Sequence, residues 1–220
     1  MDAVIANFFE AVGAPSKDVR VIVAGEYGIT PVTGAILPNR LLREAGLVAL
    51  KEGDGGLVLS PKESKAWALC DHQIAHVYVQ DGLVDAVADM FRGMDGIEWV
   101  GVGEGRGALD HPRSGDVVLV AERDHWFAYP WWFEESEAPR FARTVDIHRK
   151  PGYDPVELFV DPATGRIPLD PGLVRGSHGR GGDDPACRTL LITSWAADLP
   201  DIMHQREVAP FVLRALGVRP

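Results

Sequence analysis

The sequence predicts an α/β protein, in which a mixed sheet carries helices on its faces and a smaller α+β segment is inserted into the chain. Three short, continuous apolar runs, at 19–24, 116–122 and 189–194, have the composition of strands covered on both faces. Between the first and second runs the pattern changes to short strand candidates separated by turns. We therefore assign 1–38 and 114–220 to the α/β core and 39–113 to an α+β cap.

The remaining elements follow from periodicity and turn residues. Apolar residues of 4–12 fall on one helical face, and Gly13-Ala14-Pro15 ends this first helix. After Pro38, "NRLLREAGLVAL" predicts a short helix that ends at Gly46, and 83–92 predicts another. A closing amphipathic helix is expected at 206–216. The strands expected in the cap are 47–50, 57–59, 66–69, 74–79 and the segment "GIEWVGV".

A glycine-rich stretch, "GVGEGRGALDHPRSG", precedes the second apolar run. A dinucleotide-binding fingerprint needs a helix directly after its glycines, and Pro112 opposes a helix here. We interpret the stretch as a loop.

Composition limits the function classes. The 220 residues are 46% hydrophobic and 25% charged, as in a globular protein, and their formal net charge is −10. This charge, with a pI near 5.1, argues against a binder of nucleic acid polymers, although a few local cations suffice for a small phosphorylated substrate. Two cysteines without metal-type spacing fit a reducing compartment, and the opening residues predict neither a signal peptide nor a membrane span. We expect a cytoplasmic protein.

The first apolar run ends in "GEYGIT", so Glu26, Tyr27 and Gly28 follow a predicted strand directly. Ligands of parallel α/β sheets bind beyond the carboxyl ends of the strands, which makes this a favoured place for a site. An ordinary strand-to-loop turn with a solvated glutamate is the alternative, and on this stretch alone it is the better one.

Two histidine segments could hold a metal ion. In "TVDIHRKPGYDP", Asp146 and His148 share a face if the segment is extended. In "LVRGSHGRGGDDP", His178 lies in a glycine-rich loop before the third apolar run. Imidazole and carboxylate together suit Zn²⁺, Mn²⁺ or iron, yet exposed loop histidines often have no ligand.

Cations near these histidines could neutralise a phosphate. A basic run is also commonly just a solvated face. The cations are Arg149, Lys150, Arg175 and Arg180.

Two further segments fit packing better than catalysis. We expect His72 and His76 of "CDHQIAHVYV" to pack or to form a hydrogen bond in the cap. The aromatic run "ERDHWFAYPWWFEE" is typical of a core or an interface, and less often of a wall that stacks on a base or sugar.

The order of four segments resembles the C-terminal half of the alkaline phosphatase superfamily, and within it the type I phosphodiesterase and nucleotide pyrophosphatase family. These segments are "VIVAGEYGI", "HPRSGDVVLVAE", "GSHGR" and "REVAPFVLRALGV". In that family the first strand usually ends in Asp-His-Gly, a later His-Gly supplies another metal ligand, and the closing helix reads V-A-P-T-x-L-x-x-L-G. The resemblance implies an alkaline-phosphatase-like α/β/α sheet, present in part, with 39–113 as the variable cap.

The resemblance also implies a set of site residues. Glu26 and Tyr27 stand where the family has its Asp-His metal pair, and a phenol is a poorer ligand than an imidazole because its pKa is ~10. His178 matches the late metal ligand, so we expect Glu26 and His178 to come close in space. The larger share of oxygen ligands would shift preference from Zn²⁺ toward Mn²⁺ or Mg²⁺. Asp146 and His148 remain candidates by chemistry, with Tyr27, Arg149, Lys150 and Arg180 as candidates for binding substrate.

The family's nucleophilic Thr or Ser comes from the N-terminal half of the domain, upstream of the residues matched here. We therefore expect a fragment of a longer metal-dependent phosphoester hydrolase, which lacks a nucleophile of its own and depends on the missing half or on an oligomer. A naturally short relative is the alternative to a fragment, and a catalytically silent binding or interaction domain is the alternative function. The substrate is not specified by the sequence, because one superfamily fold handles phosphodiesters, nucleotides, phosphonates and sulfates.

Overall fold

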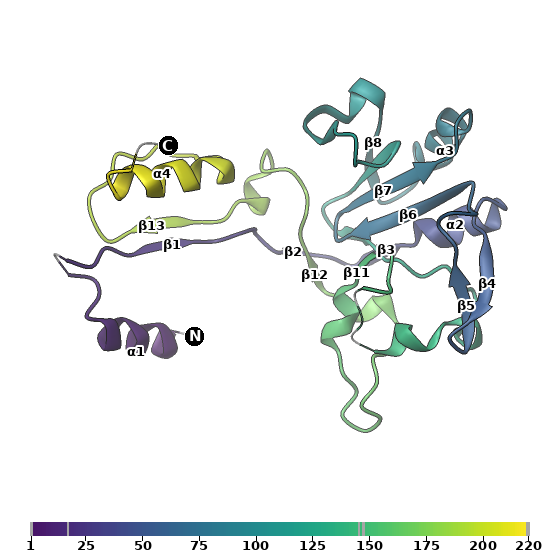
Figure 1. The fold of residues 1–220 in the computed structure, drawn as a ribbon, viewed down its shortest axis with the longest axis horizontal. Coiled ribbons are helices and arrows are strands. Elements are labelled where there is room, and N and C mark those ends of the chain that lie inside the picture. Colours follow the sequence, from purple (N-terminus) through teal and green to yellow (C-terminus); the bar gives the residue numbers. More distant parts are fainter. Residues whose placement is uncertain (1, 17, 145, 147, 219–220) are drawn as a thin grey trace. The chain divides into compact units, whose positions relative to one another are not determined.

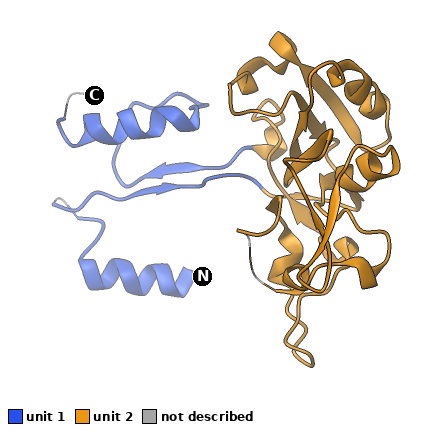
Figure 2. Ribbon diagram, turned by 45° about the vertical axis from the view of Figure 1, so that its right-hand side comes forward, with its two compact units in different colours: residues 1–28, 188–220 blue, residues 29–187 orange. Residues whose placement is uncertain are grey.

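The computed structural model describes residues 2–16, 18–144, 146 and 148–218 (Figure 1). Contacts divide the chain into two compact units, coloured separately in Figure 2. Unit 1 consists of residues 1–28 and 188–220, and unit 2 consists of residues 29–187. No helix in the described ranges is both long and apolar enough to cross a membrane.

Unit 2 is built on a five-stranded mixed sheet with the order β11-β6-β7-β9-β8. The strands β6 and β7 form an antiparallel hairpin, β9 pairs antiparallel with both β7 and β8, and β11 runs parallel to β6. The strand bounds are β6 (Ala66–Asp71), β7 (Ile74–Val79), β8 (Ile97–Val102), β9 (Val117–Ala121) and β11 (Gly152–Tyr153). The predicted mixed α/β class is confirmed, and so are the strands predicted at 74–79 and 116–122.

The pairing of β9 differs from the predicted domain boundary. We expected 116–122 to share a sheet with 19–24, but β9 lies between β7 and β8, two strands of the predicted cap. The contacts accordingly separate the chain at residues 28 and 188 rather than at 38 and 114. A continuous apolar run indicates burial on both faces, as β9 has, but carries no information on which strands lie beside it.

Helices α2 (Pro38–Glu44) and α3 (Val84–Phe91) contribute to the same core. Pro38 begins α2 at a position where its missing N–H costs nothing, and Gly46, with φ of 71°, follows the end of that helix. On α3, Val87, Ala88 and Phe91 are buried at helical spacing, as the periodicity predicts.

Three short strand pairs surround the main sheet. β2 (Thr30–Pro31) pairs antiparallel with β12 (Gly176–Ser177), β3 (Gly34–Ile36) pairs parallel with β10 (His125–Phe127), and β4 (Leu50–Gly53) forms a hairpin with β5 (Gly56–Leu59). The loops contain short segments of 3₁₀ helix, the first of which has a kink at Gly107. These are Gly103–Leu109, Glu135–Glu137, Arg140–Arg143, Pro155–Leu158, Pro171–Leu173 and Pro185–Cys187 in unit 2, and Gln205–Glu207 in unit 1.

The aromatic run after β9 belongs to the core. Tyr129, Trp131 and Trp132 are nearly fully buried and pack edge to face, with ring centroids 5.3–5.9 Å apart. The indole N–H of Trp131 donates to the carbonyl of Leu57 at 2.9 Å, so its buried polar atom is satisfied. The core interpretation of this run is therefore confirmed for these three rings.

Unit 1 contains α1 (Asp2–Val12), β1 (Ile22–Ala24), β13 (Leu191–Thr193) and α4 (Val208–Ala215). β1 and β13 form an antiparallel pair, which Figure 1 shows side by side. Helix α4 packs through Phe211, whose ring stacks on Trp195.

The burial predicted for the strands of unit 1 is not found. No residue of α1 is buried, and Val23 of β1 and Ile192 of β13 are exposed. The sequence predicted strands covered on both faces. In the described residues each strand has one partner, so one edge of each and much of their apolar surface remain uncovered.

Candidate functional site

The turn between β6 and β7 brings the main candidate groups together. Asp71 ends β6, and His72 follows with φ of 57°, a left-handed conformation that is uncommon outside glycine, although asparagine, aspartate and histidine adopt it more often than other residues. The main chain of the turn is anchored on both sides. Phe127 donates its N–H to the carbonyl of His72 at 2.7 Å, and Gln73 donates its N–H to the carbonyl of His178 at 2.8 Å.

His178 reaches this turn because β12 pairs with β2. The pair joins Gly176 to Pro31 and Ser177 to Thr30, and it ends directly before His178. Gly179 then passes close to the turn with φ of 116°, and a Cβ there would lie 3.2 Å from the backbone nitrogen of Gln73. The glycine of the "SHG" segment thus permits the close approach of the loop to the hairpin.

The two imidazoles are in direct contact. The ring centroids of His72 and His178 lie 3.8 Å apart, and the ring of Tyr153 lies 4.9 Å from that of His72. Tyr153 is held there by β11, in which it pairs with Asp71. We call His72, His178, Tyr153 and Asp71 the paired-histidine cluster.

The electrostatics of the cluster favour a neutral His72. Burial is the main cause that lowers its pKa to about 4, and His178 lowers it further, whereas Asp71 opposes the shift. Nδ1 of His72 is buried and has no hydrogen-bond partner in the described part of the chain. Its Nε2 lies 3.8 Å from a carboxylate oxygen of Asp71. A neutral imidazole is the form that binds metals.

A second group of potential ligands lies in the β9–β10 turn and was not predicted. Glu122, Asp124 and His125 each offer one ligand atom, and these atoms lie within 4.8 Å of one another. Among the described residues this is the one place where three such side chains come so close. In the sequence these residues form the run "ERDH". It directly precedes the aromatic residues, and the whole segment was interpreted by its aromatic content.

Gln73 connects the two groups. Its side-chain amide donates to the carbonyls of Arg123 and His125, each at 3.0 Å, while its backbone N–H holds His178. The residue is fully buried. Through Gln73, the β6–β7 turn therefore fixes the main chain of both the β9–β10 turn and the loop at His178.

Asp146 and His148 adopt a turn rather than the extended segment that the shared-face argument assumed. Arg149 donates its N–H to the carbonyl of Asp146 at 3.2 Å, which closes the turn. His148 is exposed. The guanidinium of Arg149 is half exposed and lies 3.4 Å from Asp54 and 4.0 Å from Asp146, so it is accessible although partly neutralised.

Lys150 and Arg180 are occupied by contacts within the protein. The ammonium of Lys150 is fully buried, 2.5 Å from Glu157, and donates to the carbonyl of Thr144 at 3.0 Å. Arg180 forms an ion pair with Glu98. The arrangement therefore gives Lys150 a structural role, in place of the phosphate contact that the basic run predicted.

Glu26 and Tyr27 follow β1 in unit 1, and both are exposed. The β1–β13 pairing extends to Gly25, whose N–H donates to the carbonyl of Leu190 at 2.9 Å. A Cβ on Gly25 would lie 1.8 Å from Oγ1 of Thr189, so a larger residue before Glu26 would require the Thr189 side chain to shift. The other predicted site residues, His178 among them, belong to unit 2.

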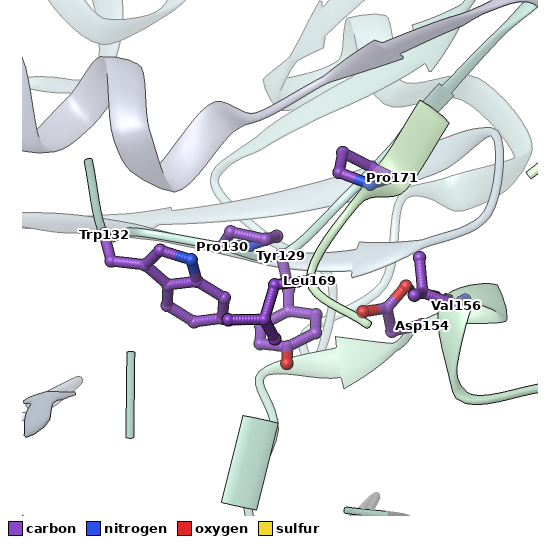
Figure 3. A pocket seen from close by; sticks show the side chains of 7 residues that line it. All are labelled: Tyr129, Pro130, Trp132, Asp154, Val156, Leu169 and Pro171. Carbon is purple, nitrogen blue, oxygen red and sulfur yellow. Dashed lines mark hydrogen bonds between the residues drawn. The ribbon is translucent and has the colours of Figure 1, made fainter. Parts of the chain in front are cut away.

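Two hollows of unit 2 are lined by residues other than those of the paired-histidine cluster. Figure 3 shows a cavity of ≈10 Å³ between aromatic residues and the carboxylate of Asp154, with room for about one water molecule. Burial raises the pKa of Asp154 to about 6. A wider hollow of ≈210 Å³ includes Trp67 and Tyr78, at the end of the β6–β7 hairpin opposite His72.

The comparisons with known proteins establish the family. The model for type I phosphodiesterase / nucleotide pyrophosphatase matches residues 1–154. The chain therefore belongs to this family, as the resemblance of its motifs predicted. The match includes Glu26-Tyr27-Gly28 and ends before His178. A search of the curated proteins found no match.

Two solved structures are similar to part of the chain. Both are phosphonoacetate hydrolase from Sinorhizobium meliloti 1021, one in complex with phosphonoacetate and the other with phosphonoformate, and both are 17% identical to this chain. The TM-scores are 0.37 and 0.38. Each similarity covers 57% of this chain and 31% of the hydrolase, so the chain spans less than a third of that protein.

Proposed function

We propose that the chain is part of a metal-dependent hydrolase of phosphate esters and that it carries the later half of the catalytic domain. The family match over residues 1–154 is the observation that carries this proposal. The substrate would be a small phosphorylated molecule. The free cysteines, Cys70 and Cys187, agree with a cytoplasmic location.

The candidate ligands are imidazole and carboxylate groups, which are of the types that bind divalent ions. His178 is the leading ligand, and its ring adjoins that of His72, whose buried Nδ1 has no hydrogen-bond partner among the described residues. Glu26 is a candidate ligand through its place in the family motif. Asp146 and His148 are secondary candidates. When bound, such an ion would neutralise charge on a phosphate ester and lower the pKa of an attacking hydroxyl.

The residues of this chain would bind and orient the ester. Arg149 is the cation best placed for a phosphate, because its guanidinium is half exposed, whereas the ammonium of Lys150 and the guanidinium of Arg180 are mostly buried in ion pairs. Tyr27 could donate a hydrogen bond to a phosphate oxygen. The nucleophile would come from polypeptide outside these residues.

Calorimetric titration with Zn²⁺ and Mn²⁺, alongside turnover of a chromogenic phosphodiester, tests the proposal. We expect weak metal binding that is reduced further in His178→Ala, and little or no turnover by the 220-residue chain, because ligands and a nucleophile are missing. His111→Ala, which changes an exposed histidine of another loop, is the matched control. Identical metal binding by the wild type and His178→Ala would exclude His178 as a ligand. Efficient turnover would show that the chain holds its own nucleophile.

A catalytically silent interaction domain is the second candidate function. The apolar side chains of α1 favour it, because Val4 is 72% exposed and Phe8 is 60% exposed. Sedimentation of the wild type and of Phe8→Ser would test it. A concentration-dependent association that the substitution abolishes is the result expected of an interaction domain, and a monomer at all concentrations would contradict it.

A further inference from the structure

We infer that His72 is a positioning residue, which holds the imidazole of His178 in the orientation that metal binding needs. This inference rests on the proposed function, because it concerns the same site. The sequence predicted only a packing or hydrogen-bonding role for His72, and in the structure its ring packs against that of His178.

The first reason is the ring contact. With centroids 3.8 Å apart and planes inclined by 35°, the ring of His72 covers the ring of His178 closely. Tyr153 backs the ring of His72 at 4.9 Å. His72 thus contacts two rings, and its close contact with the ring of His178 would restrict rotation of that ring about χ2.

The second reason is that the backbone around both rings is fixed. The N–H of Gln73 holds the carbonyl of His178, and the N–H of Phe127 holds the carbonyl of His72. The Cβ atoms from which the two rings extend are therefore set by hydrogen bonds that do not involve the rings. The ring contact with His72 acts on what these bonds leave open, the orientation of the His178 side chain.

The third reason is that His72 occupies an unfavourable position. A histidine with φ of 57° and a buried, unpartnered Nδ1 carries a cost in conformation and in desolvation. Glycine or asparagine would suit the turn alone better. The imidazole is therefore better explained by what it contacts than by the turn.

Metal ligands lose affinity when the groups that orient them are removed, typically by 10- to 100-fold. We expect His72→Ala to weaken Zn²⁺ binding at His178 by roughly that factor. His72→Phe keeps a ring but no ligand atom, and should restore the affinity to within about threefold, because a ring suffices to orient His178. Both variants keep a Cβ at the left-handed position, so their backbone cost is matched.

The test is NMR of the whole chain with ¹⁵N-labelled imidazoles, in which the His178 ring signal is followed during Zn²⁺ titration. Relaxation of this signal without metal gives a second readout, and we expect greater mobility of the His178 ring in His72→Ala. His76→Ala is the matched control, because His76 lies on β7 and accepts a hydrogen bond from Gly115 at 3.1 Å. It should change neither readout.

The outcomes separate the inference from the proposed function. If His178→Ala binds Zn²⁺ as the wild type does, the metal role of His178 fails, and the metal-free mobility of its ring still tests positioning. Unchanged mobility and affinity in His72→Ala would overturn the inference. Affinity as weak in His72→Phe as in His72→Ala would overturn it too, and would make His72 a ligand in its own right.

Discussion

Replacement of Lys150 by methionine should destabilise unit 2 strongly. The side chains of Lys150 and Glu157 are 0% and 3% exposed, and their charged atoms lie 2.5 Å apart. Methionine has nearly the same volume but no charge, so Glu157 would keep a buried carboxylate without a counter-ion. Loss of one partner from a buried pair typically costs about 3–5 kcal/mol, and the lost hydrogen bond to the Thr144 carbonyl adds about 1 kcal/mol.

Most of this loss of stability should disappear when the charges of both Lys150 and Glu157 are removed. A well-packed apolar pair is often as stable as a buried ion pair, so Lys150→Met combined with Glu157→Leu should lie within about 1–2 kcal/mol of the wild type. Urea unfolding followed by fluorescence of the buried Trp131 and Trp132 measures these free energies. Arg149→Met, at a half-exposed neighbour, should cost less than about 1 kcal/mol. A loss below about 1 kcal/mol for Lys150→Met, or a double variant as unstable as the single one, would refute the reasoning.

Two further predictions concern unit 2. The pKa of Asp154 is raised by burial from 3.8 to about 6, so the stability linked to its protonation is present below about pH 4 and is lost as the pH rises through 6. Relative to Asp154→Asn, the wild type should lose roughly 3 kcal/mol between about pH 4 and about pH 7 in urea unfolding, and parallel pH profiles would contradict this. Gly152→Ala should destabilise severely, because its Cβ would lie 1.8 Å from the carbonyl oxygen of Cys70 at φ of 114°. Gly165→Ala is the control, with positive φ but open space, and should cost only about 1 kcal/mol in thermal unfolding; similar losses for the two would count against the contact.

Local patterns predicted some elements of unit 2 well, although the strand predicted at 47–50 lies at Leu50–Gly53. The bounds of β7 and of α3 agree closely with the predicted 74–79 and 83–92, because alternation and helical periodicity are properties of a short window. β9 was predicted as buried and is buried. The family was also predictable, because its motifs keep their order along the chain.

Pairing and burial of distant segments were not predictable in this way. The apolar composition of 19–24 is that of a covered strand, but its covering depends on neighbours that a local window does not contain. Lys150 lies in a basic run typical of a solvated face, and only the fold buries it against Glu157. His72 and His178 are separated by more than a hundred residues, so their contact arises from the β2–β12 pair and the β6–β7 turn.

The central claim is that His178 serves a metal site of a phosphoester hydrolase. The most direct measurement is broadening of backbone NMR signals by Mn²⁺, a paramagnetic ion that broadens signals of nearby nuclei. We predict that the signals of His178 and of its ring neighbour His72 broaden at the same Mn²⁺ concentration, and that both effects are lost in His178→Ala. Broadening confined to Glu122, Asp124 and His125, or broadening at His72 that persists in His178→Ala, would contradict the account.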